Sequence, residues 1–143
     1  YLRALDEART ALESTVGIVE FYERIGHILT LAYVFTLLGL IFDDDAMVEW
    51  CSELAVKAHS FSIKSKDLSS IILNTIASAQ LCLLGLIPLE DLLKNIEMHI
   101  ESLEREKDFI GAYVLREFLK AVMKKGLSEE VLGLEGAKLL AVL

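Results

Sequence analysis

The residues that most often bind metals are too far apart in this sequence to form a recognisable site. Zinc and di-metal motifs place a glutamate beside a histidine or three positions before it on one helix, so that the side chains share a face. The three histidines, His27, His59 and His99, fall on separate segments, and none has a glutamate three positions before it. We therefore predict no metal site. His99 continues an apolar stripe with Ile96 and Leu103, so we expect it to be packed and hydrogen-bonded.

Nucleophilic and phosphate-transfer chemistry is equally hard to place. Neither Cys51 nor Cys82 has a histidine next to it, and the chain has no G-x-S-x-G elbow for a serine nucleophile. The glycine-rich loops that cradle phosphates are also missing. We therefore predict that the chain is not an enzyme and needs no cofactor. Both cysteines lie in apolar contexts without a CxxC spacing, which is typical of reduced, buried thiols in a cytoplasmic protein.

The charge balance bears on the class of partner. Lys and Arg number 14 against 22 Asp and Glu, which gives a formal net charge of −8. A nucleic-acid-binding face must be basic, because binding releases phosphate counterions, so we predict no nucleic-acid partner. The acidic run Asp43–Asp45 lacks the glycine and the final glutamate of a calcium loop. It is better explained as the cap of a following helix.

Helices must position all of these residues. Hydrophobic residues make up 54% of the chain, there is one proline, and no segment alternates with a period of two. Apolar residues instead recur at helical spacing between well-marked breaks. Seven helices are predicted, over about Leu2–Arg24, Ile28–Phe42, Ala46–Phe61, Leu68–Leu86, Leu89–Arg105, Asp108–Lys124 and a last one capped by Ser128.

The breaks between helices recur at a regular interval. The helices that follow Gly26, Lys66 and Glu106 begin about forty residues apart, and the sequence SKDLSSI from Ser65 is echoed by EKDFIGA from Glu106. Such a step in an all-helical chain is typical of stacked helical hairpins, none of which buries its apolar face alone. We predict three hairpins after one unpaired helix, all within a single domain that spans residues 1–143.

The hairpin sequences resemble the tetratricopeptide (TPR) repeat family. The segment LLGLIFDDDAMVEWCSELAVKA, from Leu37, has a Leu-Gly pair, an aromatic residue three positions later, a turn and then small residues. The segment LLGLIPLEDL from Leu83 repeats the Leu-Gly pair, and FLKAVMKKGLSEEV from Phe118 resembles the family's inter-helix turn. The resemblance implies a right-handed α-α superhelix (TPR-like) of about seven antiparallel helices. It also implies a protein-interaction scaffold without chemistry of its own, as part of a regulatory or signalling protein.

The resemblance further implies a concave groove lined by the first helix of each hairpin. The positions that match this groove are Tyr33, Thr36 and Leu40, then Leu73, Ile76 and Gln80, then Tyr113, Arg116 and Lys120. With Lys124 one turn later, Arg116 and Lys120 would place three cations on one helical face, suited to an acidic peptide. An ordinary basic surface near a helix end explains the same cations, and Tyr33 and Tyr113 fit a core as well as a groove.

A membrane-associated helical protein is the alternative from another class. Residues 68–88 contain no Asp, Glu, Lys or Arg, and mean hydropathy is +0.48. Against a spanning helix, this segment carries several Ser, Thr, Asn and Gln residues and lacks a basic flank and an aromatic belt. A helix pressed between neighbours on several sides is also expected to be apolar all round.

The carboxyl-terminal end is unusually apolar for a terminal repeat. The last helix ends GAKLLAVL, with Leu139, Leu140 and Leu143 and no polar closing segment. Terminal repeats normally need a polar outer face. Two expectations stay open. Either the chain is a fragment of a longer protein whose further repeats or domains cover this end, or a second copy covers it in a homodimer.

Overall fold

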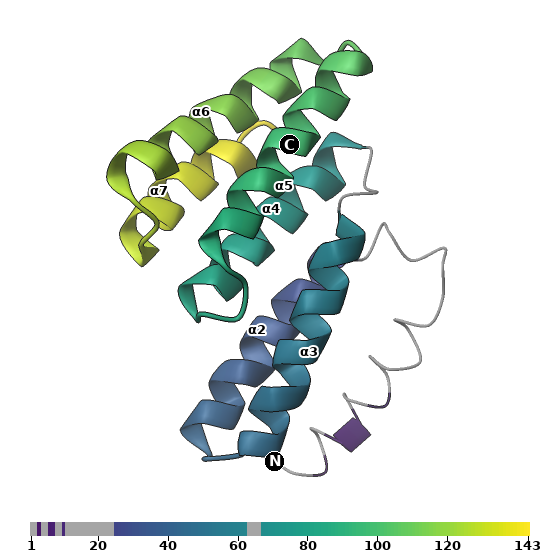
Figure 1. Cartoon of the computed structure of the whole chain (residues 1–143), viewed down its shortest axis with the longest axis vertical. Coiled ribbons are helices and arrows are strands. Elements are labelled where there is room, and N and C mark those ends of the chain that lie inside the picture. The colour runs from purple at the N-terminus through teal and green to yellow at the C-terminus, as the bar shows by residue number, and fades with distance from the viewer. Residues whose placement is uncertain (1–2, 4–5, 8–9, 11–24, 63–66) are drawn as a thin grey trace.

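The computed structural model of the chain describes residues 25–62 and 67–143, together with residues 3, 6, 7 and 10. The described elements are all helices, and no strand occurs among them (Figure 1). The fold is therefore all-α, as predicted. The helices are α2 (Ile25–Ile41), α3 (Asp45–Ser62), α4 (Leu68–Leu83), α5 (Leu89–Arg105), α6 (Phe109–Lys125) and α7 (Glu129–Leu140). The predicted first helix, Leu2–Arg24, lies almost wholly outside the described residues.

Local signals decide where these helices begin. Four of them start at a side chain that accepts the backbone N–H of the residue three positions on, which satisfies one of the donors left over at a helix start. The donor–acceptor distances lie between 2.9 and 3.1 Å. The capping residues are Asp44, Asp67, Asp108 and Ser128. The predicted capping role of the Asp43–Asp45 run is thus confirmed, and Asp44 is the residue that performs it.

Local signals also determine where the helices end. After α4 the chain turns at Gly85, which has a φ of 78°, a backbone conformation that glycine adopts without strain. The N–H of Leu86 then donates to the Leu81 carbonyl, and the N–H of Gly85 donates to that of Cys82, both at 3.0 Å. This pair of bonds ends α4 at Leu83 rather than at the predicted Leu86. Helix α2 begins at Ile25, three residues before the predicted Ile28, so Gly26 lies in its first turn.

The cap at Ser128 gives a direct test of these local signals. Replacing Ser128 by Ala removes the acceptor for the Val131 N–H and is expected to lower the free energy of unfolding by about 1 kcal/mol. A Ser128→Asp variant keeps an acceptor at the positive end of α7 and should lose almost nothing. Urea denaturation followed by circular dichroism measures both. An equal loss in the two variants would show that the cap does not stabilise α7.

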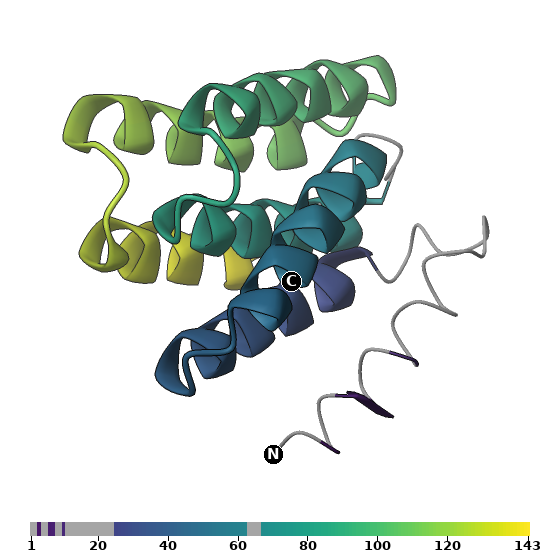
Figure 2. The same ribbon diagram turned by 60° about the horizontal axis from the view of Figure 1, so that its bottom comes forward.

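Helices α4 to α7 form a closed four-helix arrangement. Each contacts the next along the chain, and α7 returns to contact α4. In Figure 2, α5 and α6 form one layer above α4 and α7. One hydrophobic core joins all four helices and includes Ile72 of α4, Ile96 of α5, Phe118 of α6 and Leu139 of α7. Sharing one core among four helices is the packing of a helical bundle.

The hairpin of α2 and α3 packs against this bundle through α4. A second core between α2, α3 and α4 includes Leu29, Ala55 and Leu81. Helix α4 contacts α2 and α3 on one side and α5 and α7 on its other sides. Most of its side chains are therefore buried, including the polar side chains of Ser78 and Thr75. This surrounding explains why residues 68–88 can be free of charge. Within residues 25–62 and 67–143, no helix combines the length and hydropathy that crossing a membrane requires.

The expected superhelix is not confirmed, although its hairpins are present. Helix α2 lies beside α4, as stacked first helices should. The next step of the stack is different, since α7 packs along α4 on the far side, whereas α6 approaches α4 closely at Gly111, beside Leu68. The predicted groove of three first helices therefore stays a prediction.

The apolar carboxyl-terminal end is partly covered by the chain itself. Leu139 is 1% exposed and belongs to the bundle core, so its predicted role as a contact between copies is corrected. Leu140 and Leu143 remain exposed. A homodimer through these two residues stays a prediction.

Candidate functional site

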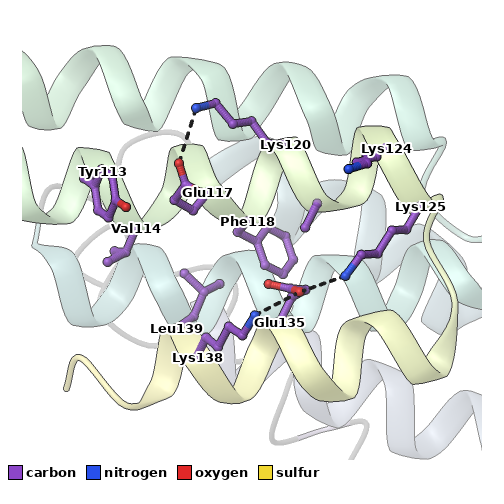
Figure 3. A pocket seen from close by; sticks show the side chains of 11 residues that line it. Tyr113, Val114, Glu117, Phe118, Lys120, Lys124, Lys125, Glu135, Lys138 and Leu139 are labelled. Atoms are coloured by element: carbon purple, nitrogen blue, oxygen red, sulfur yellow. Dashed lines mark hydrogen bonds and ion pairs between the residues drawn. The ribbon is translucent and has the colours of Figure 1, made fainter.

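A surface groove runs between α6 and α7 with a volume of about 470 Å³ (Figure 3). Its floor is apolar, because Phe118 and Leu139 of the bundle core reach it from the two helices. Its walls are polar and mostly basic. Eleven side chains line it: Tyr113, Val114, Glu117, Phe118, Lys120, Ala121, Lys124, Lys125, Glu135, Lys138 and Leu139.

A buried carboxylate organises one end of the groove. The Glu135 side chain is only 7% exposed, and one of its oxygens lies 3.3 Å from Lys138 Nζ and 3.6 Å from Lys125 Nζ. A carboxylate removed from water is costly unless cations compensate it. The two ammonium groups supply this compensation, and Glu135 in turn holds them at the groove wall. One lysine comes from α6 and the other from α7, so the carboxylate also links the two helices (Figure 3).

The remaining groove lysines come from α6. Lys120 Nζ lies 3.3 Å from a Glu117 oxygen in an exposed pair, which contributes little to stability. Lys124 is exposed one turn further on. Four lysines and two glutamates line the groove, so it carries a surplus of positive charge on a chain whose net charge is −8. Such a local reversal of sign attracts acidic groups.

The structure brings together some of the residues proposed from the sequence. Tyr113, Lys120 and Lys124 all line the groove. Arg116 belongs to the same helix but does not line the groove, and it forms an ion pair with Glu104 of α5. Of the three cations expected together, the groove therefore contains Lys120 and Lys124, while Arg116 is paired with α5.

The proposed residues of the first two hairpins lie elsewhere. Tyr33 is half-buried against the core between α2, α3 and α4. Thr36 is buried, and its hydroxyl donates to the Ala32 carbonyl at 2.7 Å, so it offers no group to a partner. Gln80 is half-buried on α4 and does not line the groove. None of these three residues lines the groove that contains Tyr113.

Sequence reasoning missed the two residues of α7 that shape the groove. Glu135 and Lys138 are joined at i, i+3, a spacing at which helical side chains meet. The signal for a buried carboxylate is present in the sequence, because Glu135 interrupts the stripe of Leu132 and Leu139 on the core face of α7. Its cation from α6, Lys125, depends on how two helices pack and has no such signal.

A second polar cluster lies where α3, α4 and α5 meet. The Nδ1 atom of His59 lies 2.9 Å from Ser78 Oγ, and the Asn95 amide donates to Ser62 Oγ at 2.7 Å. We name these four residues with His99 the polar seam. His99 is packed as expected, at 2% exposed, but its Nε2 atom has no hydrogen-bond partner. In the part of the chain that the structure describes, no group of three or more His, Cys, Asp and Glu side chains could hold a metal ion.

Burial controls the protonation of both histidines in the seam. Burial lowers the pKa of His99 to about 4, and the nearby charge of His59 acts in the same direction. Burial also lowers the pKa of His59, although a backbone hydrogen bond and the charge of Asp91 oppose this. Both side chains are therefore neutral at pH 7. The seam holds together two parts of the fold rather than offering a charged binding surface.

Comparison with known proteins yields no relative from which a function could be transferred. No protein-family model matches the chain, and neither a curated protein nor a solved structure does.

Proposed function

We propose that this chain is a protein-interaction scaffold that binds an acidic segment of a protein partner in the groove between α6 and α7. The observation that carries the proposal is the gathering of four lysines and Tyr113 around one groove of a chain with a net charge of −8. The hairpin order of α2 to α7 and the tetratricopeptide resemblance support the same role. A place in a regulatory or signalling protein belongs to this proposal.

The chemistry of the groove favours an acidic stretch over a single carboxylate. Lysine ammonium groups act as point charges and do not impose the paired geometry that an arginine fork imposes on one carboxylate. Lys120, Lys124 and Lys125 are distributed along more than one turn of α6. Several glutamates or aspartates in a row would meet them in turn, while the apolar floor contacts the peptide's methylene groups.

Charge reversal in the groove tests the proposal. A fluorescein-labelled peptide of six glutamates is the probe, and fluorescence anisotropy measures its binding. The double change Lys120→Glu with Lys124→Glu is expected to weaken binding about tenfold or more, which corresponds to about 1.4 kcal/mol. Because both side chains are exposed, the variant should fold like the wild type. Binding should also weaken between about 50 and 300 mM salt, since exposed charges are screened.

The matched control changes the net charge by the same amount elsewhere. Lys94 on α5 and Lys107 before α6 are exposed and do not line the groove. The Lys94→Glu with Lys107→Glu variant should bind the probe almost as tightly as the wild type. Equal weakening in the two double variants would show a general charge effect and reject the groove as the site. Absence of binding to the wild type at low salt would reject the proposal itself.

A further inference from the structure

Three large apolar side chains are exposed together at the start of α6. Phe109 is 65% exposed, Ile110 72% and Tyr113 61%. Exposed apolar residues are common singly, but a cluster of this kind usually marks a contact surface. We name these three residues the anchor patch. They lie on the side of α6 that faces away from Gly111, Ala112 and Leu115, the buried residues of the same turns.

Close packing beneath the anchor patch explains why these side chains point outward. At Gly111, a Cβ atom would lie 2.9 Å from Leu68 Cδ1 and 2.8 Å from Asp108 Oδ2. The first turn of α6 thus approaches the first turn of α4 and its own cap too closely for a side chain. No room exists on this side for a phenylalanine or an isoleucine. The core gains nothing from the anchor patch, so its apolar character calls for another explanation.

The anchor patch and the lysine groove form one surface. Tyr113 belongs to both, because it lines the groove. Phe109 and Ile110 precede it by four and three positions, the spacings at which side chains on a helix are neighbours. Along α6, therefore, apolar and aromatic groups come first and the lysines at 120, 124 and 125 follow.

We infer that the partner segment carries an apolar, aromatic-containing anchor beside its acidic stretch, and that this anchor binds Phe109, Ile110 and Tyr113. The inference rests on the proposed function and specifies its partner. At a rise of 1.5 Å per residue, Tyr113 and Lys124 are about 16 Å apart along α6. An extended peptide covers this distance in about five residues. The anchor and the acidic stretch are thus separated by about five residues in the partner.

The size of the anchor patch fits a peptide better than a second copy of this chain. A large side chain has a surface of about 200 Å², so three side chains that are each about two-thirds exposed offer about 400 Å² of surface to a partner. A stable interface between two proteins buries about 800 Å² on each partner. The lysines next to the anchor patch attract the acidic stretch of the proposed partner segment. One segment can therefore bind both the anchor patch and the lysines.

Two peptides compared by fluorescence anisotropy test the inference. One is the six-glutamate probe with a glycine-serine tail. The other has the same composition plus Trp-Leu, placed five residues from the glutamates. The wild type is expected to bind the anchored peptide about tenfold more tightly than the plain one. The Phe109→Ser with Ile110→Ser variant should lose this advantage and still bind the plain peptide as the wild type does.

Leu134→Ser is the matched control, because Leu134 is an exposed leucine of α7 that does not line the groove. It should leave both affinities unchanged. Equal binding of the two peptides to the wild type, with binding still sensitive to Lys120→Glu and Lys124→Glu, would overturn the inference and leave the proposed function standing. Binding of neither peptide would reject both. A wild-type dimer in sedimentation that the Phe109→Ser with Ile110→Ser variant converts to a monomer would assign the patch to a second copy and overturn the inference.

Discussion

Between pH 6.5 and pH 4, the free energy of unfolding of the wild type is expected to fall by about 3 kcal/mol more than that of a His99→Leu variant. The reason is the difference in proton uptake between the folded and unfolded states. His99 has a pKa of about 4 in the folded chain and an ordinary pKa of 6.5 when unfolded. Each unit of difference corresponds to about 1.4 kcal/mol.

The direction of this effect follows from which state binds the proton. Below pH 6.5 the unfolded chain protonates at this histidine, whereas the folded chain does not until about pH 4. Stability is therefore fully present above pH 6.5, falls as the pH decreases, and stops falling on this account below about pH 4. Burial at 2% exposure causes the shift, because a charged imidazole is poorly solvated in the seam.

Leucine is a suitable replacement at position 99. The Nε2 atom of His99 has no hydrogen-bond partner to lose, and the neighbours on α5 are Ile96 and Leu103. Urea denaturation at a series of pH values gives the free energy for both proteins, and carboxylates affect both alike. A His59→Gln variant should lose nearly as much stability between pH 6.5 and pH 4 as the wild type, since His59 is less deeply buried than His99. Parallel pH curves for wild type and His99→Leu would contradict a buried neutral His99.

Helix positions could be predicted because their signals lie within a few residues of each break. Asp67, Asp108 and Ser128 each accept an N–H three positions on, and such caps are visible in the sequence. The start of α2 could not be placed in this way. Gly26 indicated a break, but a glycine inside a helix costs only about 1 kcal/mol, which packing of α2 against α3 and α4 offsets.

The arrangement of the helices depends on longer-range contacts and was harder to predict. A forty-residue step indicates hairpins, but it does not say which helix of the third hairpin packs on α4. The packing of the helices pairs Arg116 with Glu104 of α5 and brings Glu135 next to Lys125. Tyr113, Lys120 and Lys124 could be identified because they share one helix face. The α7 residues of the groove required the packing of α6 on α7.

Substitutions of two adjacent leucines at the end of α7 test whether α4 to α7 form a closed bundle or an open stack of hairpins. Leu139→Ala is expected to lower the free energy of unfolding by about 2 to 5 kcal/mol, because truncating a buried leucine leaves a cavity. Leu139 is 1% exposed in a core that α4 to α7 share. Leu140 is 47% exposed, and Leu140→Ala should change stability by less than about 1 kcal/mol.

Measuring both variants at several protein concentrations separates burial within one chain from burial between two copies. If Leu139 packs inside the bundle, the urea midpoint of the wild type is independent of concentration, and Leu139→Ala lowers it equally at every concentration. If Leu139 were instead buried between two copies, the urea midpoint of the wild type would rise with protein concentration. The midpoint of the Leu139→Ala variant would not depend on concentration. Equal, small losses for Leu139→Ala and Leu140→Ala would contradict the return of α7 to α4. They would favour the open superhelix, in which α6 lies beside α4 and its lysines face Gln80.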